Sequence, residues 1–275
     1  MSLSLAMEVE GMRVMAHVHS EIAEDPLVVI SKHWPASVAL GPVKDIDEPR
    51  LRAALAQYIE NETVEFLVGA GPPPRDASDL NSAEDDMQGR QFGLYRHVPR
   101  ILNLLHGLAP GRVSGIMEST EHATPDIEAF STAAAAAGIA WSGPYMLCSS
   151  HWMPIARPGL WWMFGHLQLP TTALCRETGR AGIVHLTPAP VARTPISEII
   201  EPGWFSIMET RQDNDSAVFH CLAQQNRDAQ APDQYAPSNT VKSEATGEER
   251  RLLAVEEERL SGYPAGYTEA RDSYF

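Results

Sequence analysis

The chain has few basic residues, and this deficit bears on its partners. Among 275 residues there are 21 Lys or Arg against 36 Asp or Glu, so the formal net charge at pH 7 is -15. Domains that bind nucleic acid are usually basic, because Lys and Arg neutralise the phosphates. The composition therefore predicts no direct sequence-specific binding of nucleic acid. An acidic surface suits a container that must not adhere to its contents.

Cysteine and long hydrophobic runs are also scarce. The three cysteines, Cys148, Cys175 and Cys221, are odd in number and widely spaced, which is typical of reduced thiols rather than of a disulfide framework. The amino terminus lacks the basic stretch of a secretory signal. The most apolar window, residues 160–169, is too short to cross a membrane. We predict a cytoplasmic or virion protein that is neither secreted nor membrane-bound.

Hydrophobic periodicity predicts an α+β fold, with a mixed sheet, three or four packed helices, a β-rich second half and an extended C-terminal arm. Helices are expected at residues 47–59, 92–105 and 124–138, with Asp47 and Thr124 as N-caps. Strands are expected at the short apolar runs 27–30, 64–68, 113–117, 139–147, 160–167, 182–186, 204–209 and 217–222.

The amino-terminal residues 3–19 alternate between apolar and polar side chains. Leu3 and Val9 follow one phase and Met12 and Val18 the other, with the change at Gly11. A slip of one residue turns every following side chain to the opposite face of a strand. We therefore expect either one long strand with a bulge at Gly11 or two strands that meet there.

The last part of the chain is unusually polar, with no Ile, Met or Trp between residues 223 and 275. Such a segment buries too little apolar surface to offset its ordering entropy. We predict one globular body over residues 1–222, with a possible subdivision near 139, and an arm over 223–275 that orders on a neighbouring subunit. A capping box of Thr246 and Glu249 predicts one short helix at about 247–261.

Two groups of apolar side chains are candidates for a subunit interface. Leu252, Leu253 and Leu260 line one side of the helix expected in the arm. Trp161 and Trp162 lie in an aromatic-rich region and, in a strand, point to opposite faces, so one of them needs cover from outside its own sheet. The alternatives are core packing for the tryptophans and an arm that folds back over its own chain.

His17 and His19 are two residues apart, so in a strand both imidazoles point to the same face, as in many metal sites. The run His17-Val18-His19-Ser20 resembles the opening motif of the polymerase and histidinol phosphatase (PHP) family of metal-dependent phosphoesterases. That resemblance implies a metal-dependent hydrolase, although Ala16 stands where the family has an acidic residue and the chain has no Asp-x-His. The alternative is a pair of polar residues on the solvated face of an edge strand.

Cys148 and His151 have the spacing of half a zinc site, a thiolate and an imidazole with two residues between them. A second pair with compact spacing is missing, so the alternative is a buried thiol beside a histidine. Gly69-Ala70-Gly71 follows an expected strand as a phosphate-binding loop would, but Pro72 replaces the helix that would hold a phosphate. The chain has no Gly-x-Ser-x-Gly nucleophile motif. No cofactor is predicted.

The polar arm, the acidic charge and the absence of a catalytic motif favour a structural subunit of a large homo-oligomeric assembly, in particular a capsid-type virion protein. Its partners would be copies of itself or other subunits of the assembly. One alternative is a metal-dependent hydrolase that uses His17 and His19, and another is a non-catalytic adaptor in a multiprotein complex. On balance the sequence favours a protein that is not an enzyme.

Overall fold

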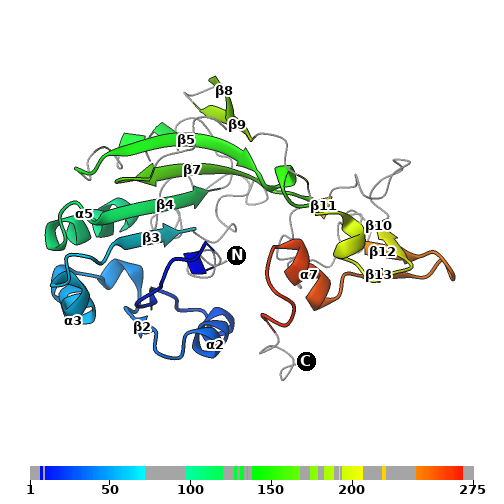
Figure 1. Ribbon diagram of the computed structural model, residues 1–275, viewed down its shortest axis with the longest axis horizontal. Helices are drawn as coiled ribbons and strands as arrows, with labels where there is room; N and C mark the ends of the chain where they lie inside the picture. The colour runs from blue at the N-terminus through cyan, green and yellow to red at the C-terminus, as the bar shows by residue number, and fades with distance from the viewer. Residues whose placement is uncertain are drawn as a thin grey trace, which may run out of the picture. The chain divides into compact units, whose positions relative to one another are not determined.

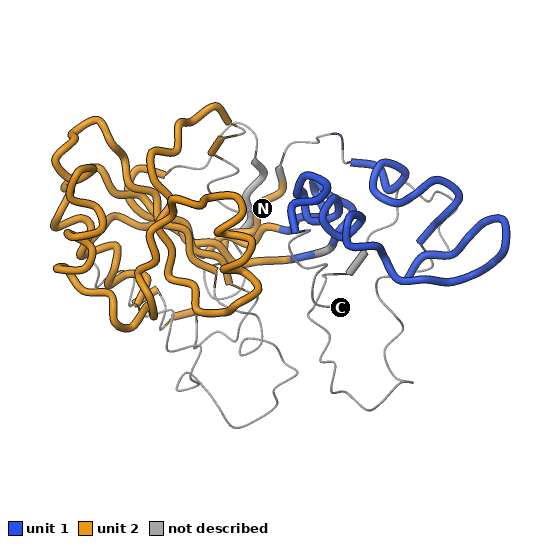
Figure 2. The backbone as a smooth tube through the Cα atoms, turned by 90° about the horizontal axis from the view of Figure 1, so that it is seen from below, with its two compact units in different colours: residues 1, 148–157, 188–275 blue, residues 2–147, 158–187 orange. Residues whose placement is uncertain are grey.

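The computed structural model describes residues 7–8, 10–71, 97–119, 127–128, 131–132, 135, 138–167, 174–178, 183–188, 192, 194–206, 219–220 and 240–268. The chain divides into two compact units, coloured separately in Figure 2. Unit 2 comprises residues 2–147 and 158–187, and unit 1 comprises residues 1, 148–157 and 188–275. Both units are therefore assembled from segments that are far apart in the sequence.

Unit 2 is built on a six-stranded sheet with the strand order β3-β4-β7-β5-β9-β8 (Figure 1). The strands are β3 (Phe66–Ala70), β4 (Val113–Ser119), β5 (Trp141–Cys148), β7 (Pro158–Phe164), β8 (Leu174–Thr178) and β9 (Val184–Pro188). β3 runs parallel to β4, and β7 runs antiparallel to β4. β5 and β9 are parallel. The sheet is mixed, and the predicted α+β class is confirmed.

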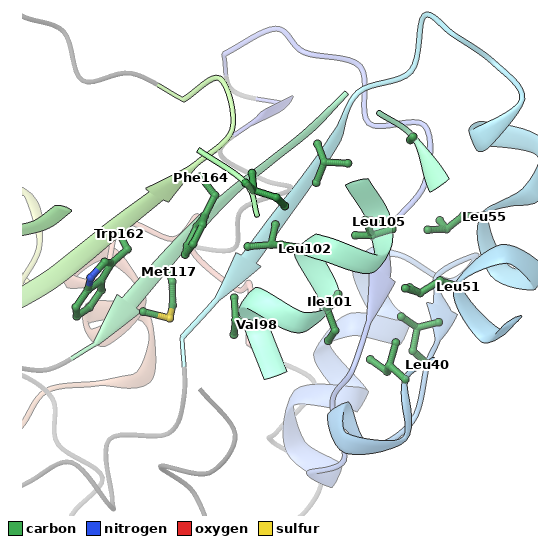
Figure 3. Packing of buried hydrophobic residues seen from close by; sticks show 14 of the residues in the cluster. Leu40, Leu51, Leu55, Val98, Ile101, Leu102, Leu105, Met117, Trp162 and Phe164 are labelled. Atoms are coloured by element: carbon green, nitrogen blue, oxygen red, sulfur yellow. The ribbon is translucent and has the colours of Figure 1, made fainter. Parts of the chain in front are cut away.

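Two helices pack near the β3–β4 side of this sheet. α3 (Glu48–Ile59) begins at Asp47, whose carboxylate accepts a hydrogen bond from the Arg50 N–H at 2.9 Å, as expected of an N-cap. α5 (His97–Leu108) has a continuous apolar face, with Leu102 fully buried at its centre. Figure 3 shows side chains of α5 between those of α3 and those of the sheet.

The alternation of β4 fixes which of its faces α5 covers. A Cβ at Gly115 would lie 2.8 Å from a methyl carbon of Leu102, so Gly115 faces α5 at close range. Met117 shares that face and is fully buried. Ile116 and Glu118 consequently lie on the opposite face, where they are half-buried.

The amino-terminal part of unit 2 differs from the predicted strand. Residues 7 and 8 are helical, and Gly11, with φ of 75°, ends this turn while Met12 N–H donates to the Met7 carbonyl at 2.9 Å. Gly11 is thus a helix-terminating residue, which explains the change of phase. Among residues 7–8 and 10–19, Val18–His19 (β1) alone forms a strand, and it pairs in parallel with β2 (Val38–Ala39).

The strand predicted at residues 27–30 is also wrong, because these residues lie within α2 (Glu24–His33). Glu24 and Asp25 occupy its first turn and Lys32 and His33 its last, which favours a helix through the macrodipole. A run of four apolar residues does not by itself distinguish a strand from a helix.

Unit 1 contains a three-stranded antiparallel sheet of β10 (Trp204–Ser206), β12 (Thr240–Ser243) and β13 (Glu249–Arg251), followed by α7 (Ala254–Leu260). A separate parallel pair joins β6 (Ile155–Ala156) and β11 (Phe219–His220). The short helices are η3 (Ser149–His151) and η5 (Ile196–Glu198) here and η1 (Val43–Asp45) in unit 2. The core consists of Ile155, Ile196, Ile199, Ile200, Val241, Leu252 and Leu260.

Two buried carboxylates hold the end of unit 1 together. Glu256, fully buried, accepts two hydrogen bonds from the guanidinium of Arg250 at 2.7 and 2.9 Å. It also accepts the N–H groups of Leu253 and Glu201, at 2.7 and 2.9 Å. Burial acts to raise the pKa of Glu256, but these hydrogen bonds outweigh it and lower the pKa.

The second buried carboxylate, Glu258, fastens the segment that follows α7. It accepts hydrogen bonds from the Gly266 N–H at 2.6 Å and from both the backbone N–H and the hydroxyl of Thr268. Its pKa is also lowered, since these bonds outweigh the opposing effect of burial. A carboxylate with three donors can be buried without an adjacent cation.

The predicted C-terminal arm is therefore folded in its described part, residues 240–268. Leu252 and Leu260 are buried in the core of unit 1 beside Val241. The helix is shorter than predicted and begins at Ala254, because Thr246 belongs to the connection between β12 and β13 and Glu249 is the first residue of β13. Glu256, not Glu249, caps the helix by accepting the Leu253 N–H.

The remaining predicted elements agree with the structure where it describes them. Helices are confirmed at α3 and α5, and residues 127–128, 131–132 and 135 of the third predicted helix are helical. The N-cap predicted at Thr124 lies outside the described residues. Predicted strands coincide with β3, β4, β5, β7, β9, β10 and β11. In the ranges described, no helix is long and apolar enough to cross a membrane.

Candidate functional site

The carboxyl ends of β3 and β4 bring a carboxylate beside two glycines. In open sheets of parallel strands, ligands bind outside these ends, where the loops leave the sheet. Glu118 is the last residue but one of β4, and Gly71 directly follows β3. A Cβ added to Gly71 would lie 3.8 Å from the Oε2 atom of Glu118. The glycine thus leaves open the space beside this carboxylate.

Gly159 borders the same carboxylate from β7. Glu118 pairs with Trp161 across the β4–β7 ladder, and Ser119 pairs with Leu160. A Cβ at Gly159 would lie 3.3 Å from Oε1 of Glu118, 3.2 Å from Nε1 of Trp161 and 3.5 Å from the Ser119 carbonyl. A carboxylate, an indole N–H and a backbone carbonyl therefore surround one position that only a hydrogen atom fills.

A second set of polar groups follows the parallel pair β1–β2. The Ser20 hydroxyl donates to the Gly41 carbonyl at 2.7 Å and so joins the segment after β1 to the segment after β2. Oε1 of Glu21 accepts the N–H groups of Ile22 and Ala23, both at 2.8 Å, which fixes this carboxylate just beyond β1. Ile22 is 73% exposed, an unusual position for a large apolar side chain.

His17 and His19, the predicted metal ligands, lie on β1 and just before it. Their rings stack 5.9 Å apart at 25°, and His17 also stacks on Trp34 at 4.7 Å. The Nδ1 atoms of both histidines are buried without a hydrogen-bond partner within the described part of the chain. Burial, and then the neighbouring His19, lowers the pKa of His17, so its neutral form is favoured.

A zinc ion shared by the two histidines would need one nitrogen of each ring about 2 Å from the metal. Stacked rings do not converge on one point. No group of three or more His, Cys, Asp or Glu that could hold a metal occurs among the residues whose placement is given. Metal binding by His17 and His19 stays a prediction.

The other predicted residues are distributed over both units. Cys148 and His151 lie in unit 1, where Cys148 accepts a hydrogen bond from the Ser150 hydroxyl at 3.1 Å and His151 packs edge-on against Trp152. Their role in binding zinc stays a prediction. Among the interface candidates, Trp162, Leu252 and Leu260 are buried inside their own units, whereas Trp161 is half-buried and Leu253 is 39% exposed.

Sequence comparison finds no match, either to a known protein family or to a curated protein. Solved structures, in contrast, share the fold. The methyltransferase EhMeth of Entamoeba histolytica aligns with a TM-score of 0.55 and 11% identity over 94% of this chain and 81% of that chain. A putative DNA modification methyltransferase encoded within an E. coli prophage aligns with a TM-score of 0.51 and 14% identity, over 76% of this chain and 58% of that chain.

A mutant of DNMT2 from Spodoptera frugiperda gives a TM-score of 0.46 and 16% identity, over 72% of this chain and 56% of that chain. The chain thus spans somewhat more than half the length of two of these three proteins. The two alignments with TM-scores above 0.5 show that this chain shares its fold with those two proteins.

This finding corrects the functional prediction. A capsid-type structural subunit is wrong, because the fold is shared with methyltransferases, and the virion location and the assembly partners lose their basis with it. The expectation of no nucleic-acid binding is overturned by the same finding, since one structural neighbour is described as a DNA modification methyltransferase. Net charge misled this prediction, because it is a property of the whole surface and does not describe a single site.

Sequence reasoning missed Glu118 and Glu21. Glu118 ends an apolar run that was expected to form a strand, and a carboxylate at the carboxyl end of such a strand is a recognisable signal. Glu21 was missed because the alternation over residues 3–19 predicts either one long bulged strand or two strands that meet at Gly11, and not the short parallel strand Val18–His19 that precedes Glu21. Gly71 was considered only as part of a phosphate loop.

Proposed function

We propose that this chain is a methyltransferase that acts on a nucleic-acid base and binds that base with Glu118. The observation that carries the proposal is the carboxylate of Glu118, placed between Gly71 and Gly159 at the carboxyl ends of β3 and β4 in a methyltransferase fold. Ligands of open parallel sheets bind at this end of the strands.

The chemistry of the site suits the polar edge of a flat heterocycle. A carboxylate accepts hydrogen bonds from an exocyclic amino group or a ring N–H, and the Trp161 indole N–H is a donor for a ring nitrogen or carbonyl. Gly71 leaves room for a planar ring beside the carboxylate, whereas Gly159 allows the Glu118 carboxylate and the Trp161 indole to lie close to its own backbone. Glu118 would also take up or return a proton at the base edge during the reaction.

The fold implies S-adenosylmethionine as methyl donor, and the residues beyond β1 fit its adenosine part. A carboxylate shortly after a strand is the usual partner of ribose hydroxyls, and Glu21 is fixed there by two backbone N–H groups. The exposed side chain of Ile22 is an apolar contact for a purine ring. When bound, the donor supplies an electrophilic methyl group on a sulfonium.

The test is methyl transfer from radiolabelled S-adenosylmethionine to single- and double-stranded DNA and RNA. Glu118→Gln keeps the shape of the side chain but removes its charge, and we expect it to lower kcat/KM about 100-fold or more. The matched control is Glu65→Gln, at an exposed residue directly before β3. Equal activity of wild type and Glu118→Gln, or methyl transfer to protein alone, would contradict the proposal.

A further inference from the structure

The loop after β2, residues 40–46, is held by side chains from other elements. We refer to these residues as the β2-exit loop. Four of its carbonyl oxygens, those of Leu40, Gly41, Val43 and Ile46, accept hydrogen bonds from side chains. The donors are Ser20, Arg50 and Arg100. Side chains from outside the loop thus hold four of its seven residues.

Arg100 of α5 makes the larger part of this attachment. Its Nη2 donates to the Val43 carbonyl at 2.8 Å, and its Nη1 donates to the Ile46 carbonyl at 2.5 Å. The third donor, Nε, is taken by Nδ1 of His97 at 3.2 Å. The guanidinium is a rigid planar fork, so binding two carbonyls at once fixes their separation and orientation.

Arg50 and Ser20 complete the attachment from two further directions. Nη1 of Arg50, on α3, donates to the Leu40 carbonyl at 3.0 Å. Ser20, beyond β1, donates to the Gly41 carbonyl at 2.7 Å. Gly41 has φ of 69°, which places the chain in the left-handed region and turns it away from β2. The shape of the loop is thus determined by Arg50 of α3, Arg100 of α5 and Ser20.

The β2-exit loop lies beside the residues that we propose bind adenosine. The β2-exit loop leaves the carboxyl end of a strand that is paired in parallel with β1, and the Ser20–Gly41 hydrogen bond places it beside the segment that carries Glu21 and Ile22. In parallel sheets, the loops that leave neighbouring strands form opposite walls of one ligand site. A loop held in a single shape binds a rigid ligand without first paying the entropy of ordering.

We propose that Arg100 and Arg50 are positioning residues that hold the β2-exit loop in the shape that binds the adenosine part of the methyl donor. This inference rests on the proposed function. Neither arginine contacts the ligand; each acts through the carbonyls of the loop. Ser20 joins the loop to the segment that carries Glu21, so the same attachment also holds the carboxylate that we propose binds the ribose.

The experiment measures binding of S-adenosylhomocysteine by calorimetry and hydrogen exchange of the amides at 40–46, in the full chain. Arg100→Lys keeps the charge but cannot span two carbonyls, so we expect the Kd to rise roughly 10-fold and the loop amides to exchange faster. Arg50→Ala removes one bond, and we expect a smaller rise of roughly 3-fold. Arg52→Ala is the matched control, since Arg52 lies on the same helix α3 with an exposed side chain that donates to Glu48 at 2.9 Å.

A purely structural role would lower the melting temperature and leave the Kd of the folded protein unchanged, which would overturn the inference. Donor-specific positioning instead raises the KM for the donor and leaves the KM for nucleic acid as it is. If the wild type binds S-adenosylhomocysteine and Arg100→Lys binds it equally well, only this inference fails. If the wild type does not bind it at all, the proposed donor site fails, and the inference fails with it.

Discussion

The two units of this chain are stabilised by different kinds of buried groups. Unit 2 packs a sheet against helices through a large apolar cluster in which Leu102, Met117 and Trp162 are almost fully buried (Figure 3). In the part of unit 1 that the structure describes, the cluster has seven buried apolar side chains, and two buried carboxylates, Glu256 and Glu258, add to it. A small core thus relies on satisfied polar groups where a larger core relies on apolar area.

This difference shows why a polar sequence is not necessarily an unstructured one. The hydrogen bonds to Glu256 and Glu258 come mostly from backbone N–H groups and from Arg250, so the carboxylates organise the chain around them. Arg250 in turn lies over the ring of Trp204 at 4.2 Å. Charged residues in this segment act as internal structural groups, and their number alone does not measure how disordered it is.

The largest loss of stability is expected from a substitution of Glu256. Glu256→Ala leaves two backbone N–H groups without their acceptor and Arg250 paired with the exposed Glu201 alone of its two carboxylates, so we expect the free energy of unfolding of unit 1 to fall by about 4 kcal/mol. Denaturation followed by hydrogen exchange at residues 240–268 measures this. The control Glu257→Ala, at an exposed neighbour on the same helix, should change it by less than about 0.5 kcal/mol. Equal losses in both variants would contradict the role of the buried carboxylate.

In unit 2 the corresponding change is Leu102→Ala, which opens a cavity between α5 and β4. Because Leu102 is fully buried and touches Gly115, we expect a loss of about 3 kcal/mol. Asn103→Ala, at an exposed position on the same helix, is the control. Hydrogen exchange in β4 reports the loss, and an unaffected β4 would show that α5 does not stabilise the sheet.

A smaller effect is expected at Glu258. Glu258→Gln retains one carbonyl acceptor but loses the charge that strengthens the bonds from Gly266 and Thr268. We expect a loss of about 1.5 kcal/mol, with faster hydrogen exchange confined to residues 261–268. Faster exchange throughout β12 and β13 would instead indicate that Glu258 supports the whole unit.

The smallest expected effect is on the pH dependence of stability, which differs between the two units. The pKa of His17 is lowered, so the unfolded chain binds a proton first as pH falls below about 6.5, and unit 2 loses stability from there downward. The pKa values of Glu256 and Glu258 are also lowered, so the stability they give unit 1 is present above about pH 4.3 and lost below it.

Thermal unfolding between pH 7.5 and 3.5, followed separately in each unit by hydrogen exchange, measures both windows. His17→Phe should remove the loss in unit 2 near pH 6 and leave unit 1 unaffected. A first loss in unit 1 above pH 5 would contradict this assignment of groups to units.

Most of the elements were predictable because their signals are local. The cap at Asp47, the apolar stripe of α5 and the short apolar runs of the second half each depend on residues close in sequence. The errors fall where local patterns have two solutions. The four apolar residues of α2 suit a strand or a helix, and the alternation around Gly11 arises from a helical turn followed by irregular chain.

The candidate site was less predictable, because its members come from separate strands. Gly71, Glu118 and Gly159 are 41 or more residues apart, and only the register of β3, β4 and β7 brings them to one point. Arg100 reaches the β2-exit loop from 54 residues away. No sequence motif in this chain has a fixed spacing as long as 41 or 54 residues, so the sequence alone does not bring these residues together.

The sequence by itself determined the class of the fold, the positions of most strands and helices, and the acidic character of the surface, since each follows from side-chain type and local periodicity. Only the tertiary structure decided that residues 240–268 of the polar end pack within unit 1, and that Glu118 lies between two glycines beside Trp161. The physical reason is that a buried carboxylate is stable only where its donors are, and those donors come from parts of the chain that only the fold brings together.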